Sequence, residues 1–219
     1  RYDESGVALS PDLTRALYIT GSTLGVDNQL VLWDIGAEKE LWSQKFLAGP
    51  PYEQFVDLAP SVWSKDSSFV AFPISANDYR TSLYIVDRDG IQQEVRPGAK
   101  ESASRGLNWS PDGRYLAFVS YVTNDSDTLG VIVYDRVANQ VLEICTLGTR
   151  LSATHNIEAG TLVWSPDSRY LVFGMGEDWA QEDNRLLLLD IFTGEVTLLK
   201  QGKLISLIGW STAESWVLP

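Results

Sequence analysis

Continuous apolar runs recur along the chain, and each one ends in an aspartate: residues 30–34, 83–87, 131–135 and 186–190. Short apolar runs of this kind predict strands that are buried on both faces. Each run follows a short strand that ends in Trp in most units and a second strand such as residues 115–120, and it precedes an alternating strand such as residues 140–144. With the turns between them, these segments predict antiparallel units of four strands.

A short phrase begins each unit and fixes its register. It reads Leu-Ser-Pro-Asp at 9–12, Trp-Ser-Lys-Asp at 63–66, Trp-Ser-Pro-Asp at 109–112 and 164–167, and Trp-Ser-Thr-Ala at 210–213. The serines are 54, 46, 55 and 46 residues apart, within or near the period of propeller blades. We therefore predict an all-β protein, a β-propeller of four-stranded antiparallel blades, with four complete blades and a partial fifth.

The predicted blades occupy about residues 7–45, 60–96, 106–145, 160–200 and, for the partial fifth, 204–219, within one domain over 1–219. Because the fifth blade has room for only about two strands, the ring closes poorly, borrows strands from another chain, or continues in further sequence. An open sheet edge of this kind favours self-association. The chain could also be a fragment of a larger one.

The phrase Trp-Ser-Pro-Asp-Gly-Arg-Tyr-Leu-Ala-Phe at 109–118 resembles the repeat of TolB-type (WD40-like) propellers, and the copy at 164–173 is nearly as good. The resemblance implies a β-propeller and an extracytoplasmic location, periplasmic or secreted, in a bacterium. Similar repeats occur in periplasmic scaffold proteins, in surface proteins and in the propeller that caps prolyl oligopeptidases. The resemblance therefore specifies a fold more narrowly than a function.

Composition narrows the class of partner. The chain has 17 Lys and Arg against 29 Asp and Glu, a formal net charge of −12. Such a balance argues against nucleic acid and against an anionic membrane surface. No apolar stretch approaches the roughly 18 residues that a membrane-spanning helix needs. A protein or peptide partner, and a basic one in particular, fits the charge.

Loops that join the second strand to the third share one end of a propeller with the loops that join successive blades. The predicted members of the first set, 21–28, 76–81, 123–128 and 177–184, are rich in Asn and Asp. Such residues commonly satisfy the backbone of turns. Alternatively, two of these loops could bind Ca²⁺ through carboxylate oxygens, those of Asp125 and Asp127 in one loop and of Asp178 and Asp183 in the other. Neither of these two loops matches the EF-hand pattern. No other cofactor is expected.

Candidate partner-binding residues lie in the same acidic loop face. Trp179 stands among Asp178, Glu182 and Asp183, where an indole could receive a basic side chain. Two longer loops, predicted over 43–62 and 145–161, contribute Tyr52 after a Gly-Pro-Pro segment and His155, the one histidine. The tryptophans at the repeat position, 63, 109, 164 and 210, are instead predicted to pack between blades.

No catalytic constellation is visible, because a single histidine accompanies no nucleophile elbow and no metal-binding helix motif. We therefore predict a non-catalytic scaffold that binds a protein or peptide through the acidic loop face. One alternative is the gating or cap portion of a larger enzyme such as a prolyl-oligopeptidase-like hydrolase. A second is a metal-dependent propeller lactonase or lyase, which would need several inward carboxylates or histidines around a metal.

Overall fold

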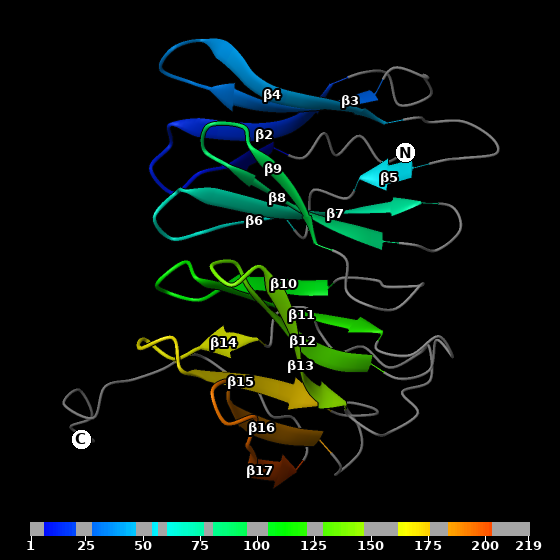
Figure 1. The fold of residues 1–219 in the computed structure, drawn as a ribbon, viewed down its shortest axis with the longest axis vertical. Coiled ribbons are helices and arrows are strands. Elements are labelled where there is room, and N and C mark those ends of the chain that lie inside the picture. The colour runs from blue at the N-terminus through cyan, green and yellow to red at the C-terminus, as the bar shows by residue number, and fades with distance from the viewer. Residues whose placement is uncertain are drawn as a thin grey trace.

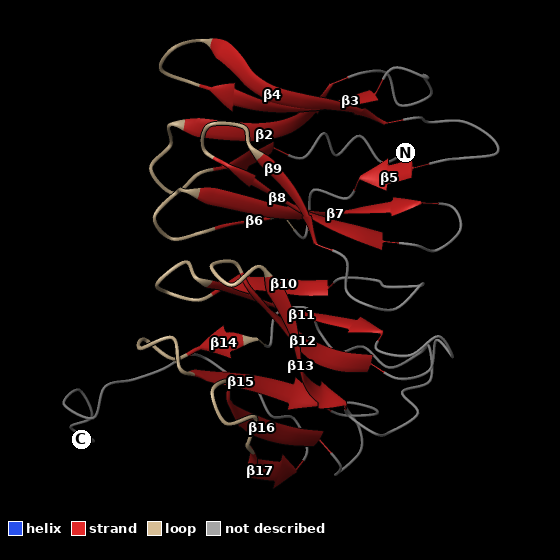
Figure 2. Ribbon diagram, in the orientation of Figure 1, coloured by secondary structure: helices blue, strands red, loops and turns tan. Residues whose placement is uncertain are grey.

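The computed structural model describes residues 7–20, 28–46, 54–56, 61–76, 81–95, 105–121, 129–146, 162–175 and 184–202. All regular elements in these ranges are β-strands (Figure 2). No helix in the described ranges has the length and apolar character needed to cross a membrane. The all-β prediction is confirmed.

The strands form four antiparallel sheets that follow one another along the long axis of the molecule (Figure 1). Blade 1 contains β1 (Val7–Leu9), β2 (Arg15–Thr20), β3 (Asn28–Asp34) and β4 (Lys39–Phe46). Blade 2 contains β5 (Gln54–Val56), β6 (Val62–Trp63), β7 (Phe69–Ala76), β8 (Thr81–Asp87) and β9 (Gln92–Val95). Blade 3 contains β10 (Arg105–Trp109), β11 (Tyr115–Tyr121), β12 (Leu129–Asp135) and β13 (Gln140–Thr146). Blade 4 contains β14 (Val163–Trp164), β15 (Tyr170–Met175), β16 (Asn184–Asp190) and β17 (Val196–Gly202).

Four propeller-like blades are therefore present, as the repeat predicted, whereas the predicted partial fifth blade at 204–219 lies outside the described residues. One local expectation was wrong. Residues 54–56, predicted to lie in a loop over 43–62, form β5. The reason is that β6 has only two residues and pairs with Val70 and Ala71, so the rest of this edge of β7 can pair with β5, from Ile74 to Ala76.

The core lies between the sheets, and the third strands of the two inner blades, 2 and 3, contribute to it from both faces. In β12, Val131 and Val133 pack in the cluster shared with blade 4, whereas Ile132 and Tyr134 pack in the cluster shared with blade 2. All four side chains are buried. Burial of one such apolar side chain contributes about 1.5–3 kcal/mol. The apolar runs are thus the surfaces on which blades stack.

In blades 2, 3 and 4, the aromatic residue eight positions after the repeat serine faces the preceding blade. Phe72, Phe118 and Phe173 are fully buried in the clusters that their blades share with blades 1, 2 and 3 respectively. Tyr18, the counterpart in blade 1, is partly exposed. The aromatic position that follows the repeat phrase therefore packs each of blades 2, 3 and 4 on the blade that precedes it in the chain.

The turn after the first strand has the same backbone shape in every blade, although only one copy contains glycine. The residue three positions after the serine has a φ of 69° at Gly113, 58° at Leu13, 61° at Ser67 and 60° at Ser168. The left-handed region costs an ordinary residue about 1–2 kcal/mol. Other interactions must therefore stabilise this turn, and they involve the repeat serine and aspartate.

Candidate functional site

The serine of the repeat phrase is buried and holds its turn closed through two side-chain hydrogen bonds, an arrangement that we call the serine bracket. In blade 3, the Ser110 hydroxyl donates to Asp112 Oδ1 at 2.5 Å and accepts from the Tyr115 backbone N–H at 2.9 Å. The same two bonds occur in the other three blades, around Ser10, Ser64 and Ser165. All four serines are buried. A hydroxyl held in this way closes the turn and is not presented as a nucleophile.

The aspartate of the phrase completes the bracket. Asp12 Oδ1 also accepts from the Thr14 backbone N–H at 3.0 Å, and Asp167 Oδ1 accepts from that of Arg169 at 3.2 Å. The hydrogen bond from the serine hydroxyl is the main cause that holds the pKa of each of these two carboxyls below its usual range. These charges are stabilised locally, within their own turns.

A second aspartate, at the end of each third strand, binds an arginine in three of the four blades. Arg114 donates two hydrogen bonds to Asp135, at 3.2 and 2.7 Å, and Arg169 is paired with Asp190 at 2.7 Å. In both pairs the arginine lowers the pKa of the carboxyl. Arg15 and Asp34 form the pair in blade 1.

The repeat tryptophans join one blade to the next. The indole N–H of Trp63 donates to the Ala8 carbonyl at 3.1 Å. The corresponding bonds run from Trp109 to Val62 at 3.1 Å and from Trp164 to Asn108 at 3.0 Å. The acceptors lie on β1, β6 and β10, in each case the strand that leads into the repeat phrase of the preceding blade. For these three residues, the predicted packing between blades is confirmed.

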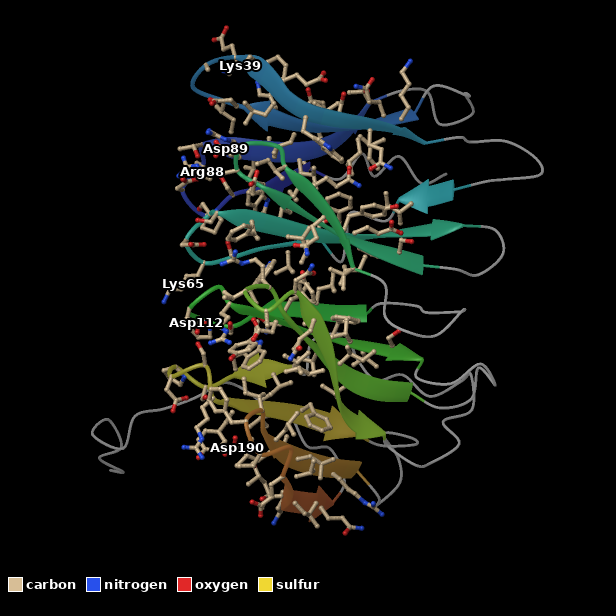
Figure 3. The ribbon with its side chains drawn as sticks, in the orientation of Figure 1. Lys39, Lys65, Arg88, Asp89, Asp112 and Asp190 are labelled. Carbon is tan, nitrogen blue, oxygen red and sulfur yellow. The ribbon has the colours of Figure 1, made fainter. Side chains whose placement is uncertain are left out.

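The brackets and arginine pairs lie at one end of the sheets, which we call the turn end, and Figure 3 shows Lys65 and Asp112 along it. Its repeated polar groups also link blades, since the Asp12 N–H donates to Ser67 Oγ at 3.0 Å and the Asp112 N–H to Ser168 Oγ at 3.2 Å. Among the described residues, no group of three or more His, Cys, Asp or Glu is placed to hold a metal ion. In the described part of the chain, the repeated polar residues thus stabilise turns and the contacts between blades.

The opposite end of the sheets, the loop end, is defined by where strands two and three meet. In blade 3, Tyr121 at the end of β11 pairs with Leu129 at the start of β12. In blade 4, Met175 at the end of β15 pairs with Arg185 near the start of β16. These strand ends lie on the same side of adjacent blades, away from the turns (Figure 1). The acidic segments 122–128 and 176–183 therefore leave from neighbouring points of the fold.

All the site residues predicted from sequence lie outside the described residues: Tyr52, Asp125, Asp127, His155, Asp178, Trp179, Glu182 and Asp183. Sequence reasoning also missed the arginine pairs of the turn end. A signal for them was present, because both Arg114 and Arg169 precede their aspartates by 21 residues. A constant spacing between opposite charges in successive repeats predicts a repeated ion pair.

Four stacked antiparallel sheets, three with four strands and one with a fifth short strand, define the chain as β-propeller in fold, with tryptophans between the sheets. No family model matches it, and no curated protein matches its sequence. Among solved structures it is similar to dipeptidyl peptidase 4 from Porphyromonas gingivalis, at 14% identity and a TM-score of 0.59, over 90% of this chain and 32% of that one.

The chain is also similar to the β-propeller domain of the Trilobed protease from Pyrococcus furiosus, at 12% identity and a TM-score of 0.56, over 90% of this chain and 57% of that one. TolB from Acinetobacter baumannii matches at 18% identity with a TM-score of 0.47, over 90% of this chain and 43% of that one. The chain thus spans about a third to rather more than half of each of these proteins. At such identities the likeness concerns the fold alone.

Proposed function

We propose that this chain is a non-catalytic β-propeller scaffold of the TolB-like type, which binds a basic protein or peptide at its loop end. The observation that carries the proposal is the contrast between the two ends. At the turn end, the repeated Ser, Asp and Arg side chains bind one another. At the loop end, β11 and β15 end in adjacent blades, and in the sequence each of these strands is followed by an acidic segment.

The chemistry of those segments supports a cationic partner. Asp125 and Asp127 belong to the segment of blade 3, and Asp178, Glu182 and Asp183 belong to that of blade 4. Carboxylates gathered on one surface raise the local concentration of a basic ligand and speed its association. Trp179 in the same segment adds a ring on which Lys or Arg could stack, worth about 0.5–1 kcal/mol at an exposed site.

Charge reversal tests the proposal. The triple variant Asp178→Lys, Glu182→Lys and Asp183→Lys changes the net charge by the same amount as a control at the turn end, Glu38→Lys, Asp89→Lys and Glu195→Lys. The control side chains are exposed. With a Lys- and Arg-rich peptide as the probe, we expect the first triple to weaken binding at least tenfold and the control to change it less than threefold. If both triple variants weakened peptide binding equally, the effect would come from net charge alone, and the proposal of a binding site at the loop end would be refuted.

The alternative hypothesis is that the same carboxylates at the loop end bind Ca²⁺ and not a peptide. Binding of Ca²⁺ to the folded state alone would raise the melting temperature, and the rise would grow with the logarithm of the calcium concentration once the site is saturated. We expect millimolar calcium to leave the melting temperature unchanged and to weaken peptide binding only as much as an equal ionic strength of sodium chloride. A calcium-specific rise that Asp125→Asn and Asp183→Asn abolish would replace the peptide proposal by a cation site.

The size of the native protein separates this proposal from that of a cap on a larger hydrolase. A scaffold of this length has a covalent mass of 24.3 kDa, whereas a cap would be part of a longer chain. Mass spectrometry of the protein from its source, denatured, measures this directly. The TolB-like repeat phrase at 109–118 also supports an extracytoplasmic location, which fractionation of the source cells would test.

A further inference from the structure

The chain contains two Asp-Gly pairs, Asp89-Gly90 and Asp112-Gly113, and both lie in turns at the turn end. An aspartate in such a pair is chemically vulnerable, because glycine has no side chain to shield its amide nitrogen. That nitrogen can attack the side-chain carboxyl of the aspartate that precedes it. The two pairs therefore allow a comparison in which the reacting groups are the same and their surroundings differ.

The glycines of the two pairs have similar backbone geometry. Their φ angles are 90° at Gly90 and 69° at Gly113. The Gly90 N–H donates to the Asp87 carbonyl at 3.0 Å, and the Gly113 N–H donates to the Ser110 carbonyl at 2.9 Å. In each pair the attacking nitrogen must therefore give up one hydrogen bond of the same kind. The difference between the two sites lies in the aspartates.

The carboxylate of Asp112 is fixed by the serine bracket. Its Oδ1 accepts from the Ser110 hydroxyl at 2.5 Å and from the Arg114 backbone N–H at 3.0 Å. Attack on Cγ requires the carboxyl group to turn its face to the Gly113 nitrogen, which breaks both bonds. A hydrogen bond to a charged group changes an equilibrium constant by about tenfold or more. The bracket should therefore slow the reaction at Asp112.

In the turn between β8 and β9, a different aspartate holds the backbone. Asp87 Oδ1 accepts from the backbone N–H groups of Asp89 and Ile91, at 2.9 and 2.8 Å. The side chain of Asp89 is exposed at the turn end (Figure 3). Among the described residues, none donates a hydrogen bond to its carboxylate. The carboxyl group of Asp89 can therefore turn to the Gly90 nitrogen without losing a hydrogen bond of its own.

We propose that Asp89 is a site of spontaneous isomerisation to isoaspartate and that the serine bracket protects Asp112 from the same reaction. The Gly90 nitrogen bonds to Cγ of Asp89, and one carboxyl oxygen leaves as water together with the amide proton, which closes a succinimide ring. Water then opens the ring. Opening at Cγ restores aspartate, whereas opening at the main-chain carbonyl leaves isoaspartate, with the main chain running through Cβ and Cγ. This inference does not depend on the proposed function of the loop end.

The modification has a structural consequence because Gly90 is confined. Isoaspartate adds one carbon to the main chain immediately before Gly90, which lies so close to blade 1 that a Cβ there would be 2.8 Å from the Leu41 carbonyl oxygen. The longer chain must therefore displace the turn from this contact. We expect the isoaspartyl form, separated from the unmodified protein by chromatography, to unfold at a lower urea concentration.

Ageing of the full chain at neutral pH tests the proposal. Chromatography of proteolytic peptides separates the isoaspartyl from the aspartyl form at each site. We expect isoaspartate to form at Asp89 at least about tenfold faster than at Asp112 in the folded protein, and at rates within about twofold of each other in urea, where the bracket is absent. Equal rates in the folded protein would overturn the proposal. A difference that persists in urea would come from the neighbouring sequence and would overturn the role of the bracket.

Two variants locate the cause. Ser110→Ala removes one of the two hydrogen bonds to Asp112, so it should raise the rate at Asp112 by about tenfold and leave the rate at Asp89 unchanged. Asp89→Glu is the control, because its longer side chain would have to close a six-membered ring, and it should abolish isomer formation at this site. If Asp89 reacts in urea but not in the folded protein, its contact with blade 1 protects it and the proposal is wrong. The comparison in the unmodified protein applies even if Ser110→Ala fails to fold.

Discussion

Gly90 lies in the turn between β8 and β9, where blade 2 touches blade 1. Its φ is +90°, and a Cβ at this position would lie 2.8 Å from the Leu41 carbonyl oxygen and 2.9 Å from Trp42 Cβ. The backbone conformation costs an alanine about 1–2 kcal/mol. Overpacking against a fixed neighbour typically adds about 1–3 kcal/mol. We therefore expect Gly90→Ala to lower the free energy of unfolding by about 2–5 kcal/mol.

Gly194 provides a matched control in the turn between β16 and β17. Its φ is +71°, and a Cβ there would meet nothing within 4 Å, so Gly194→Ala should cost only the backbone part, about 1–2 kcal/mol. Urea denaturation at pH 7 measures both, with the difference taken from the midpoints at an unchanged m-value. In a chain of this size the additional loss corresponds to a melting temperature lower by about 2–12 °C. Equal losses in the two variants would refute the argument that blade 1 confines Gly90.

Two further predictions concern the turn end. Ser110→Ala should destabilise by about 1–3 kcal/mol in urea, because it leaves the backbone N–H of a buried residue without its partner, whereas Thr193→Ala at an exposed hydroxyl should change stability by less than about 0.5 kcal/mol. The second follows from Asp190, whose pKa is lowered in the folded state by Arg169. Its contribution is present above the unfolded pKa, about 3.9, and is lost as the pH falls, so Arg169→Gln should flatten the decline of the urea midpoint below about pH 4. An unchanged decline in that variant would contradict the role given to the pair.

Much of the fold could be predicted because the residues that pack between blades occupy fixed positions in and after the repeat phrase. Trp109 and Phe118 both face the preceding blade, so their spacing encodes a contact as well as a strand. The turn geometry could not be predicted equally well. Only Gly113 signals a positive φ in the sequence, whereas Leu13 and Ser168 adopt it because the serine bracket beside them outweighs the local preference.

The short β5 shows a second limit of local pattern. Gln54–Val56 has neither the length nor the alternation of a strand, and it pairs because the edge of β7 extends beyond β6. The candidate site is a different case. Asp178 and Trp179 were chosen for the chemistry of their side chains, and their segment lies outside the repeat phrase and the apolar run that fix the contacts between blades. What could be predicted is the position of its anchors, at the ends of β15 and β16.

The direction of the tryptophan bonds has a consequence for how the protein is made. The acceptor carbonyls of Trp63, Trp109 and Trp164 precede them in the chain by 55, 47 and 56 residues. During synthesis, each new blade therefore leaves the ribosome after the surface that receives it, and domains generally form in this order. Blade 1 has Leu9 at the corresponding position and needs no earlier acceptor for an indole. Blades 2, 3 and 4 can thus each dock on the blade before them in the order in which they emerge.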